Sequence, residues 1–121
     1  MRAHVSPRGS LGPDGWVDPS AAVAASARLR GPVVIGPGCR IGADAVVGPG
    51  TVLGAACRIE AGAHVEGTVL WEDAHVGPGA RLQGCLIGRG CRIGAHAVAP
   101  AGTVLGDDST LSDYSRLSGW A

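Results

Sequence analysis

Residues 35–65 decide the fold, and in blocks of six they read IGPGCR IGADAV VGPGTV LGAACR IEAGAH V. Each block begins with an aliphatic residue, and a small residue stands two positions before the next aliphatic one. Side chains two positions apart in a strand point to the same side, so this pattern is typical of a three-residue strand with two inward side chains. Each block therefore predicts one short strand and one corner.

The same period continues outward from this stretch over nearly the whole chain. Towards the N-terminus the aliphatic positions are Leu29, Val23, Val17, Leu11 and Val5. Towards the C-terminus they are Leu70, Val76, Leu82, Ile87, Ile93, Ala99, Leu105, Leu111 and Leu117. Two steps are one residue shorter than the rest, Val65 to Leu70 and Leu82 to Ile87. A repeat of this length predicts a solenoid.

The corners have their own pattern. Proline often stands second after the aliphatic residue, and a residue that tolerates positive φ stands third. The third positions are Gly38, Asp44, Gly50, Gly62, Asp73, Gly79, Gly90, His96, Gly102 and Asp108. These positions predict tight turns with a left-handed backbone.

Three such units close one coil, and coils stacked about 4.8 Å apart form a parallel β-solenoid. The period alone fixes neither the triangular section nor the hand. The run of aliphatic-Gly-x-x-small-x units resembles the hexapeptide-repeat family, which implies a left-handed β-helix. We therefore expect an all-β chain, one left-handed parallel β-helix of about six to seven coils over residues 1–121. Repeats should be weaker in 1–28 and strong in 29–111, with a C-terminal cap at 112–121.

Within that family the chain is most similar to the C-terminal domain of sugar-nucleotide pyrophosphorylases such as mannose-1-phosphate guanylyltransferase. The residues that carry the likeness are GPVVIG at 31–36, TVLW at 68–71 and CLIG at 85–88. We expect no nucleotide-binding catalytic domain of those enzymes within these 121 residues. The resemblance implies a non-catalytic scaffold for assembly or regulation, with no catalytic, cofactor-binding or metal-binding residue.

Outward side chains give each of the three expected walls a different character. Face A presents His4, Ala22, Arg40, Arg58, His75, Arg92 and Thr110, and face B presents Ser10, Arg28, Val46, His64, Arg81, Val98 and Arg116. Face C presents the apolar stripe Trp16, Val34, Val52, Val69, Leu86 and Val104. A continuous apolar stripe on an outer surface favours a buried contact. We expect face C to be an interface, either in a homo-oligomer (dimer or trimer) or with a separate nucleotidyltransferase catalytic domain.

Face A carries a ladder of cationic side chains at Arg40, Arg58, His75 and Arg92. Arginine binds phosphate and carboxylate groups through paired N–H donors, so this ladder is a candidate anion-binding surface. The alternative interpretation is a solvated charged face.

Composition narrows the function classes further. Ten basic residues, all arginine, balance ten acidic ones, which argues against nucleic acid as a partner. The sequence shows neither a membrane-length apolar run nor a signal-peptide core, so we expect a cytoplasmic protein without membrane contact. The four cysteines, Cys39, Cys57, Cys85 and Cys91, all occupy the small inward column and should be buried, reduced thiols.

The alternative function is a stand-alone trimeric acyltransferase-like protein with a site between subunits. Hexapeptide acyltransferases resemble one another in having a trimeric assembly, an extended loop and a histidine general base at the subunit boundary. No step here exceeds six residues, so such a loop is not found, and His96 has a structural explanation at its corner. The zinc carbonic anhydrase with this fold is disfavoured because His64 and His75 fall on different faces. Ice binding is disfavoured because Thr110 alone is an outward threonine.

Overall fold

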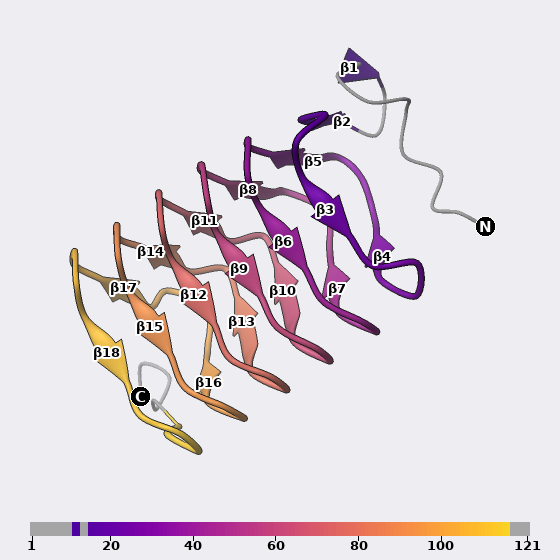
Figure 1. Ribbon diagram of the computed structural model, residues 1–121. Helices are drawn as coiled ribbons and strands as arrows, with labels where there is room; N and C mark the ends of the chain where they lie inside the picture. The colour runs from indigo at the N-terminus through magenta and orange to yellow at the C-terminus, as the bar shows by residue number, and fades with distance from the viewer. Residues whose placement is uncertain (1–10, 13–14, 117–121) are drawn as a thin grey trace.

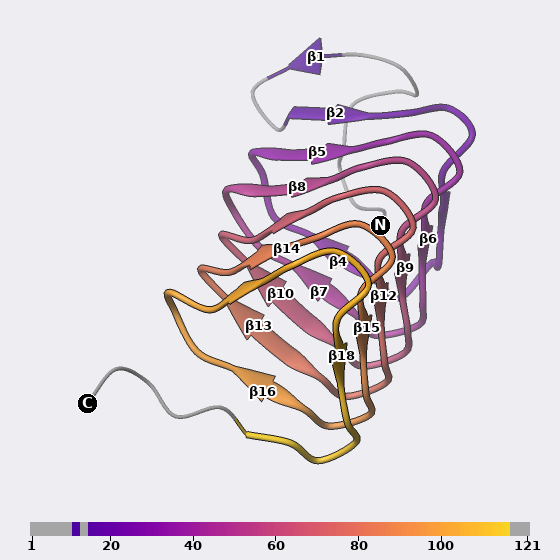
Figure 2. The ribbon, with the colours of Figure 1, turned by 90° about the vertical axis from the view of Figure 1, so that its left-hand side faces the viewer.

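Three sheets form the walls of a triangular solenoid in the computed structural model, which describes residues 11–12 and 15–116. Figure 1 shows the coils side by side from β3 to β18, and Figure 2 shows their triangular outline. The predicted left-handed parallel β-helix is the fold of this chain. No helix in the described part is long and apolar enough to cross a membrane.

Each sheet collects every third strand of the chain. Face A is β3 (Ala22–Val23), β6 (Arg40–Ile41), β9 (Arg58–Ile59), β12 (His75–Val76), β15 (Arg92–Ile93) and β18 (Thr110–Leu111). Face B is β4 (Arg28–Leu29), β7 (Val46–Val47), β10 (His64–Glu66), β13 (Arg81–Gln83) and β16 (Val98–Ala99). Face C is β1 (Leu11–Gly12), β2 (Gly15–Val17), β5 (Val33–Ile35), β8 (Thr51–Leu53), β11 (Val69–Leu70), β14 (Leu86–Ile87) and β17 (Val104–Leu105).

The strand register agrees with the three predicted faces. On face A, Arg58 pairs with Arg40 on one side and with His75 on the other. On face C, Val69 pairs with Val52 and with Leu86. A parallel register without slips places equivalent outward side chains directly above one another, so each outward column is a continuous row in space.

The number of coils is slightly smaller than predicted. The walls hold six, six and five parallel strands, which makes about five full turns rather than six to seven. At the N-terminal end, β1 pairs antiparallel with β2, so the repeat at Leu11 reverses direction and adds no coil. The repeats predicted at Val5 and Leu117 lie outside the described residues.

The interior consists of the two inward columns, and its aliphatic members from Val33 to Leu111 are buried, except Leu105, which is partly buried. Repeating the same small and aliphatic pair in every coil fills a narrow triangular section without aromatic side chains. Among the described residues, no buried side-chain nitrogen or oxygen lacks a hydrogen-bond partner. The core is therefore closed and, apart from the hydroxyl groups of Thr51 and Thr68, apolar, so chemistry must take place on the outer faces or corners.

The corners adopt the predicted left-handed backbone. Asp44, Asp73, His96 and Asp108 have φ between 57° and 59°, and the predicted corner glycines also have positive φ. The two shortened steps turn at Gly67 and Gly84, where φ is 55° and 61°. Gly84 donates its N–H to the carbonyl of Glu66 at 2.9 Å, one coil away, so both short steps lie on the corner between faces B and C.

Candidate functional site

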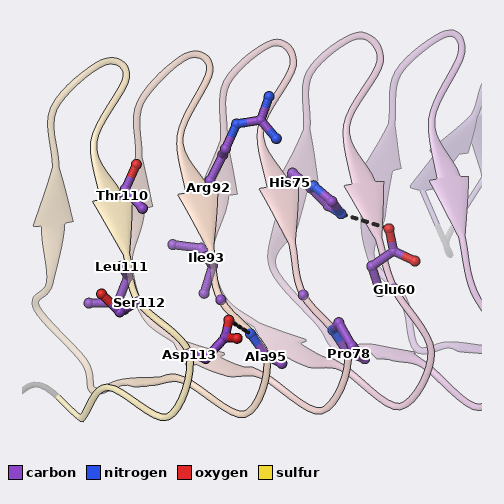
Figure 3. A pocket seen from close by; sticks show the side chains of 12 residues that line it. Glu60, His75, Pro78, Arg92, Ile93, Ala95, Thr110, Leu111, Ser112 and Asp113 are labelled. Carbon is purple, nitrogen blue, oxygen red and sulfur yellow. Dashed lines mark hydrogen bonds and ion pairs between the residues drawn. The ribbon is translucent and has the colours of Figure 1, made fainter.

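A histidine and a glutamate meet on face A. His75 projects outward from β12, and its Nε2 lies 2.6 Å from Oε2 of Glu60 (Figure 3). Glu60 comes from the corner that follows β9, one coil before His75. The two side chains are 33% and 38% exposed, so solvent and small molecules can reach the pair.

The backbone around Glu60 explains how it reaches the histidine. Equivalent corner positions on face A hold small residues, namely Ala24, Gly42, Gly77, Gly94 and Ser112. Glu60 is the one long side chain in this column, and it extends along the wall to the next coil. With Nε2–H donating to the carboxylate, Nδ1 of His75 keeps a lone pair that can accept a proton.

An open pocket of about 350 Å³ adjoins the pair. His75, Arg92 and Thr110 line it from three successive strands, and Pro78 and Asp113 line it from the corners (Figure 3). Oδ1 of Asp113 accepts a hydrogen bond from the N–H of Ala95 at 2.9 Å, which fixes the floor of this corner. The pocket thus combines a proton acceptor, a guanidinium group and an apolar floor that includes Ile93.

The arginines of the ladder are exposed. Among the described residues, Arg40, Arg58 and Arg92 take part in no salt bridge, whereas Arg89 lies 4.0 Å from Glu72. The strand register places Arg40, Arg58, His75 and Arg92 in one row on face A.

Face B holds a looser counterpart of the same pair. His64 Nε2 lies 3.9 Å from Glu66 Oε2, beyond hydrogen-bonding distance. The outward neighbours of His64 in the sheet are Val46 and Arg81. His64 is consequently a natural control for His75, because both are outward histidines beside a glutamate in the same solenoid.

The predicted stripe on face C is exposed in the single chain. Val34, Val52, Leu86 and Val104 are between 37% and 66% exposed, and Trp16 and Val69 are half-buried. Trp71 follows this face at the corner between faces C and A and is 59% exposed. Together with Val52, Val69 and Arg89, Trp71 lines a separate open pocket of about 420 Å³ at this corner.

The four cysteines are free and buried, in agreement with their predicted inward position. Burial raises the pKa of the Cys85 thiol above its usual value of 9.0. The neighbouring Cys39 thiol, together with burial, raises the pKa of Cys57. The described residues contain no group of three His, Cys, Asp or Glu side chains that could hold a metal ion.

Sequence reasoning singled out His75 but missed Glu60. The signal was present, because Glu60 interrupts a column that is otherwise glycine, alanine or serine. A polar residue that breaks a column of small ones at a corner can reach the adjacent coil, and here it reaches a histidine.

Comparisons with known proteins agree on the fold. The sequence matches the GMPPB C-terminal domain family over residues 29–120. It is 36% identical over 110 residues to the carnitine operon protein CaiE of Escherichia coli K12, covering 82% of this chain and 55% of CaiE. It is 32% identical to CaiE of Proteus sp., with 54% of that protein covered. The chain thus spans about half the length of the curated relatives it matches.

The solved structures with a similar fold include an acetyltransferase domain. The acetyltransferase domain of PglB from Neisseria gonorrhoeae matches with a TM-score of 0.69 and 30% identity, covering 85% of this chain and 48% of that one. The same domain in complex with acetyl coenzyme A matches with a TM-score of 0.61 and 29% identity, covering 85% of this chain and 53% of that one.

These likenesses correct the main functional expectation. A non-catalytic assembly domain of a sugar-nucleotide nucleotidyltransferase was expected, and the matched solved structures are acetyltransferase domains. The misleading observation was the absence of an extended loop. A loop of that kind would extend from a corner, so its absence does not exclude chemistry on the walls between the corners. On face A the wall carries the His75–Glu60 pair.

Proposed function

This chain belongs to the GMPPB C-terminal domain family of hexapeptide-repeat β-helices, and from that premise we propose that it is an acyltransferase-like protein with its site on face A, at a boundary between copies of the chain. One observation carries the proposal, the 2.6 Å contact between His75 and Glu60 beside an open pocket. The likeness to an acetyltransferase domain that binds acetyl coenzyme A supports the same reaction class.

The proposed reaction moves an acyl group from a coenzyme A thioester to an amine or hydroxyl. His75 Nδ1 accepts the proton of the attacking N–H or O–H group while the nucleophile forms a bond to the thioester carbon. The C–S bond then breaks, and the departing thiolate of coenzyme A takes up that proton from His75. A positioned general base of this kind typically contributes a factor of 10² to 10⁴ in rate.

Glu60 and Arg92 support His75 in different ways. Glu60 fixes the ring and its tautomer by accepting the Nε2–H, which is a positioning role. Arg92 pairs with His75 in the sheet and lines the same pocket, so its positive charge faces the region where the thioester oxygen becomes negative.

The proposal includes self-association through the face C stripe of Trp16, Val34, Val52, Val69, Leu86 and Val104. A threefold ring joins two different surfaces of each copy, so face C of one copy would meet another surface of its neighbour. The exposed Trp71 continues the stripe onto the corner that leads to face A. A copy covering face C would therefore border face A and wall off the open site there.

The test measures release of free coenzyme A thiol from acetyl coenzyme A in the presence of primary amines, from amino acids to amino sugars. His75→Ala should lower the rate at least 100-fold, and Glu60→Gln should lower it less while shifting its pH profile. His64→Ala is the matched control and should leave the rate unchanged. Equal loss in both histidine variants, or parent protein that neither binds nor consumes acetyl coenzyme A, would overturn the proposal.

A further inference from the structure

Face A carries a second open pocket on the N-terminal side of the His75–Glu60 pair. It encloses about 430 Å³ and is lined by Ala22, Ala24, Arg40, Gly42, Arg58 and Glu60, together with two core aliphatic residues. Glu60 lines both this pocket and the one beside His75, so the two are neighbours along the same wall.

We propose that Arg40 and Arg58 bind a phosphoryl group of the substrate in this second pocket; the assignment to a substrate rests on the acyl transfer proposed above. Arg40 pairs with Arg58 in the sheet, and no other pair of facing arginines occurs in the register of the described strands. Both side chains are exposed, and neither has a salt bridge among the described residues.

The spacing of the two arginines suits a phosphoryl group. Neighbouring strands lie about 4.8 Å apart, so the two side chains leave face A close together with like charges. A phosphoryl group offers several acceptor oxygens, and arginine donates in a planar fork that matches them. One anion between the two guanidinium groups would relieve their repulsion and satisfy donors on both.

Small residues leave space for a phosphoryl group beside Arg40, whereas the carboxylate of Glu60 disfavours an anion near it. Ala22 pairs with Arg40 in the sheet and carries only a methyl group, and Gly42 at the corner carries no side chain. Glu60 is the acidic residue that lines the pocket, and its carboxylate faces His75 in the next coil. A phosphoryl group should therefore sit towards Arg40, away from this carboxylate.

The position along the wall limits the chemistry of the ligand. His75 is one coil from Arg58 and two coils from Arg40, which is about 5 to 10 Å. A molecule whose phosphoryl group lies that far from its reacting atom could occupy both pockets at once. A phosphorylated acceptor can meet this distance directly, whereas coenzyme A meets it only with its pantetheine arm folded back, because the extended arm is longer. Binding measurements can separate the two sources.

The first measurement is titration of the parent chain with inorganic pyrophosphate at constant ionic strength. The double variant Arg40→Gln, Arg58→Gln should weaken this binding at least tenfold with an unchanged circular dichroism spectrum. The matched control is Arg28→Gln, Arg81→Gln, which also removes two outward arginines, but from non-adjacent coils of face B. The control should bind pyrophosphate like the parent. No pyrophosphate binding, or equal loss in both double variants, would overturn the subsite.

The second measurement identifies the source of the phosphoryl group. If the face A double variant also binds coenzyme A at least tenfold more weakly, the subsite serves the acyl donor. If coenzyme A binding is unchanged while pyrophosphate binding is lost, the subsite serves the acceptor. His75→Ala should keep pyrophosphate binding, so a failure of acyl transfer and a failure of the subsite give different results.

Discussion

A cysteine in the inward column does more than fill space. Cys39, Cys57 and Cys91 each place Sγ 3.0 Å from a backbone carbonyl at the corner between faces C and A, on Gly54, Trp71 and Gly106 respectively. The sequence predicts these residues as compact apolar fillers, and the structure gives them an additional role as donors to that corner. An S–H group is a weak donor, yet it reaches carbonyls that an alanine would leave without a side-chain partner.

Also at the residue scale, ionisation of the Cys85 thiol should lower the free energy of unfolding at alkaline pH. Burial raises its pKa above 9.0, so above pH 9 the unfolded chain ionises this thiol while the folded chain holds it neutral. The stabilising effect is complete below pH 9 and is lost as the pH rises towards the pKa of the folded state. We expect the free energy of unfolding to fall by up to about 1.4 kcal/mol per pH unit from this thiol.

Urea unfolding of the parent and of Cys85→Ala at pH 8, 9 and 10 measures this effect. The variant should start from a lower stability because it loses a buried side chain. Its stability should then decline less between pH 9 and 10 than that of the parent. Parallel declines in the two proteins would show that Cys85 ionises as easily in the folded chain as in the unfolded one.

At the scale of the element, several glycines that follow the aliphatic residue allow neighbouring coils to approach closely. A Cβ added at Gly88 would lie 2.7 Å from the backbone N of Asp107 in the next coil. At Gly106, the equivalent position in the last described coil of face C, an added Cβ would meet nothing within 4 Å. The same substitution should therefore lower stability at Gly88 but not at Gly106.

We expect Gly88→Ala to lower the free energy of unfolding by about 1–3 kcal/mol, the usual effect of overpacking. Gly106→Ala should leave stability unchanged or raise it by up to about 1 kcal/mol, because alanine restricts the unfolded chain. Chemical unfolding of both variants, followed by circular dichroism, makes the comparison. A loss at Gly106 as large as that at Gly88 would show that contact between coils does not determine the effect.

The element scale is also where the sequence was most informative. The strands, the three faces and the left-handed corners follow from the spacing of residues such as Ile41, Ile59 and Asp44, because one local rule is repeated in every coil. The end at Leu11 was not predictable, since a single aliphatic residue fits both a parallel and an antiparallel strand. The His75–Glu60 pair was not predicted either, because it depends on how far one corner side chain extends towards the neighbouring coil.

At the scale of the whole molecule, the three walls differ in what they can contact. Face A is cationic and carries the two adjoining pockets, and face B mixes aliphatic and charged residues. Face C presents only apolar outward side chains over about five coil spacings, roughly 24 Å. A surface of that length and polarity suits a lasting contact, which would border face A at one corner without covering its two pockets.

Association through face C should therefore be separable from binding on face A. Val52→Arg with Val69→Arg places two charges in the middle of the stripe and should shift the particle to monomer in light scattering, with an unchanged circular dichroism spectrum. Burial contributes about 25 cal/mol per Å², so losing two central contacts should weaken association by a few kcal/mol. Arg40→Glu with Arg58→Glu changes the charge of face A by four units, twice the change made by the valine variants, and should still leave the oligomer intact.

The same valine variants also test whether the site needs a second copy. If the boundary completes it, the monomer should lose acyl transfer yet still bind pyrophosphate, because Arg40 and Arg58 belong to one chain. A monomer that retains full activity would show that the His75 pocket works alone. A parent chain that is already monomeric at high micromolar concentration would refute self-association through face C. The stripe would then be better explained as the docking surface of a different polypeptide.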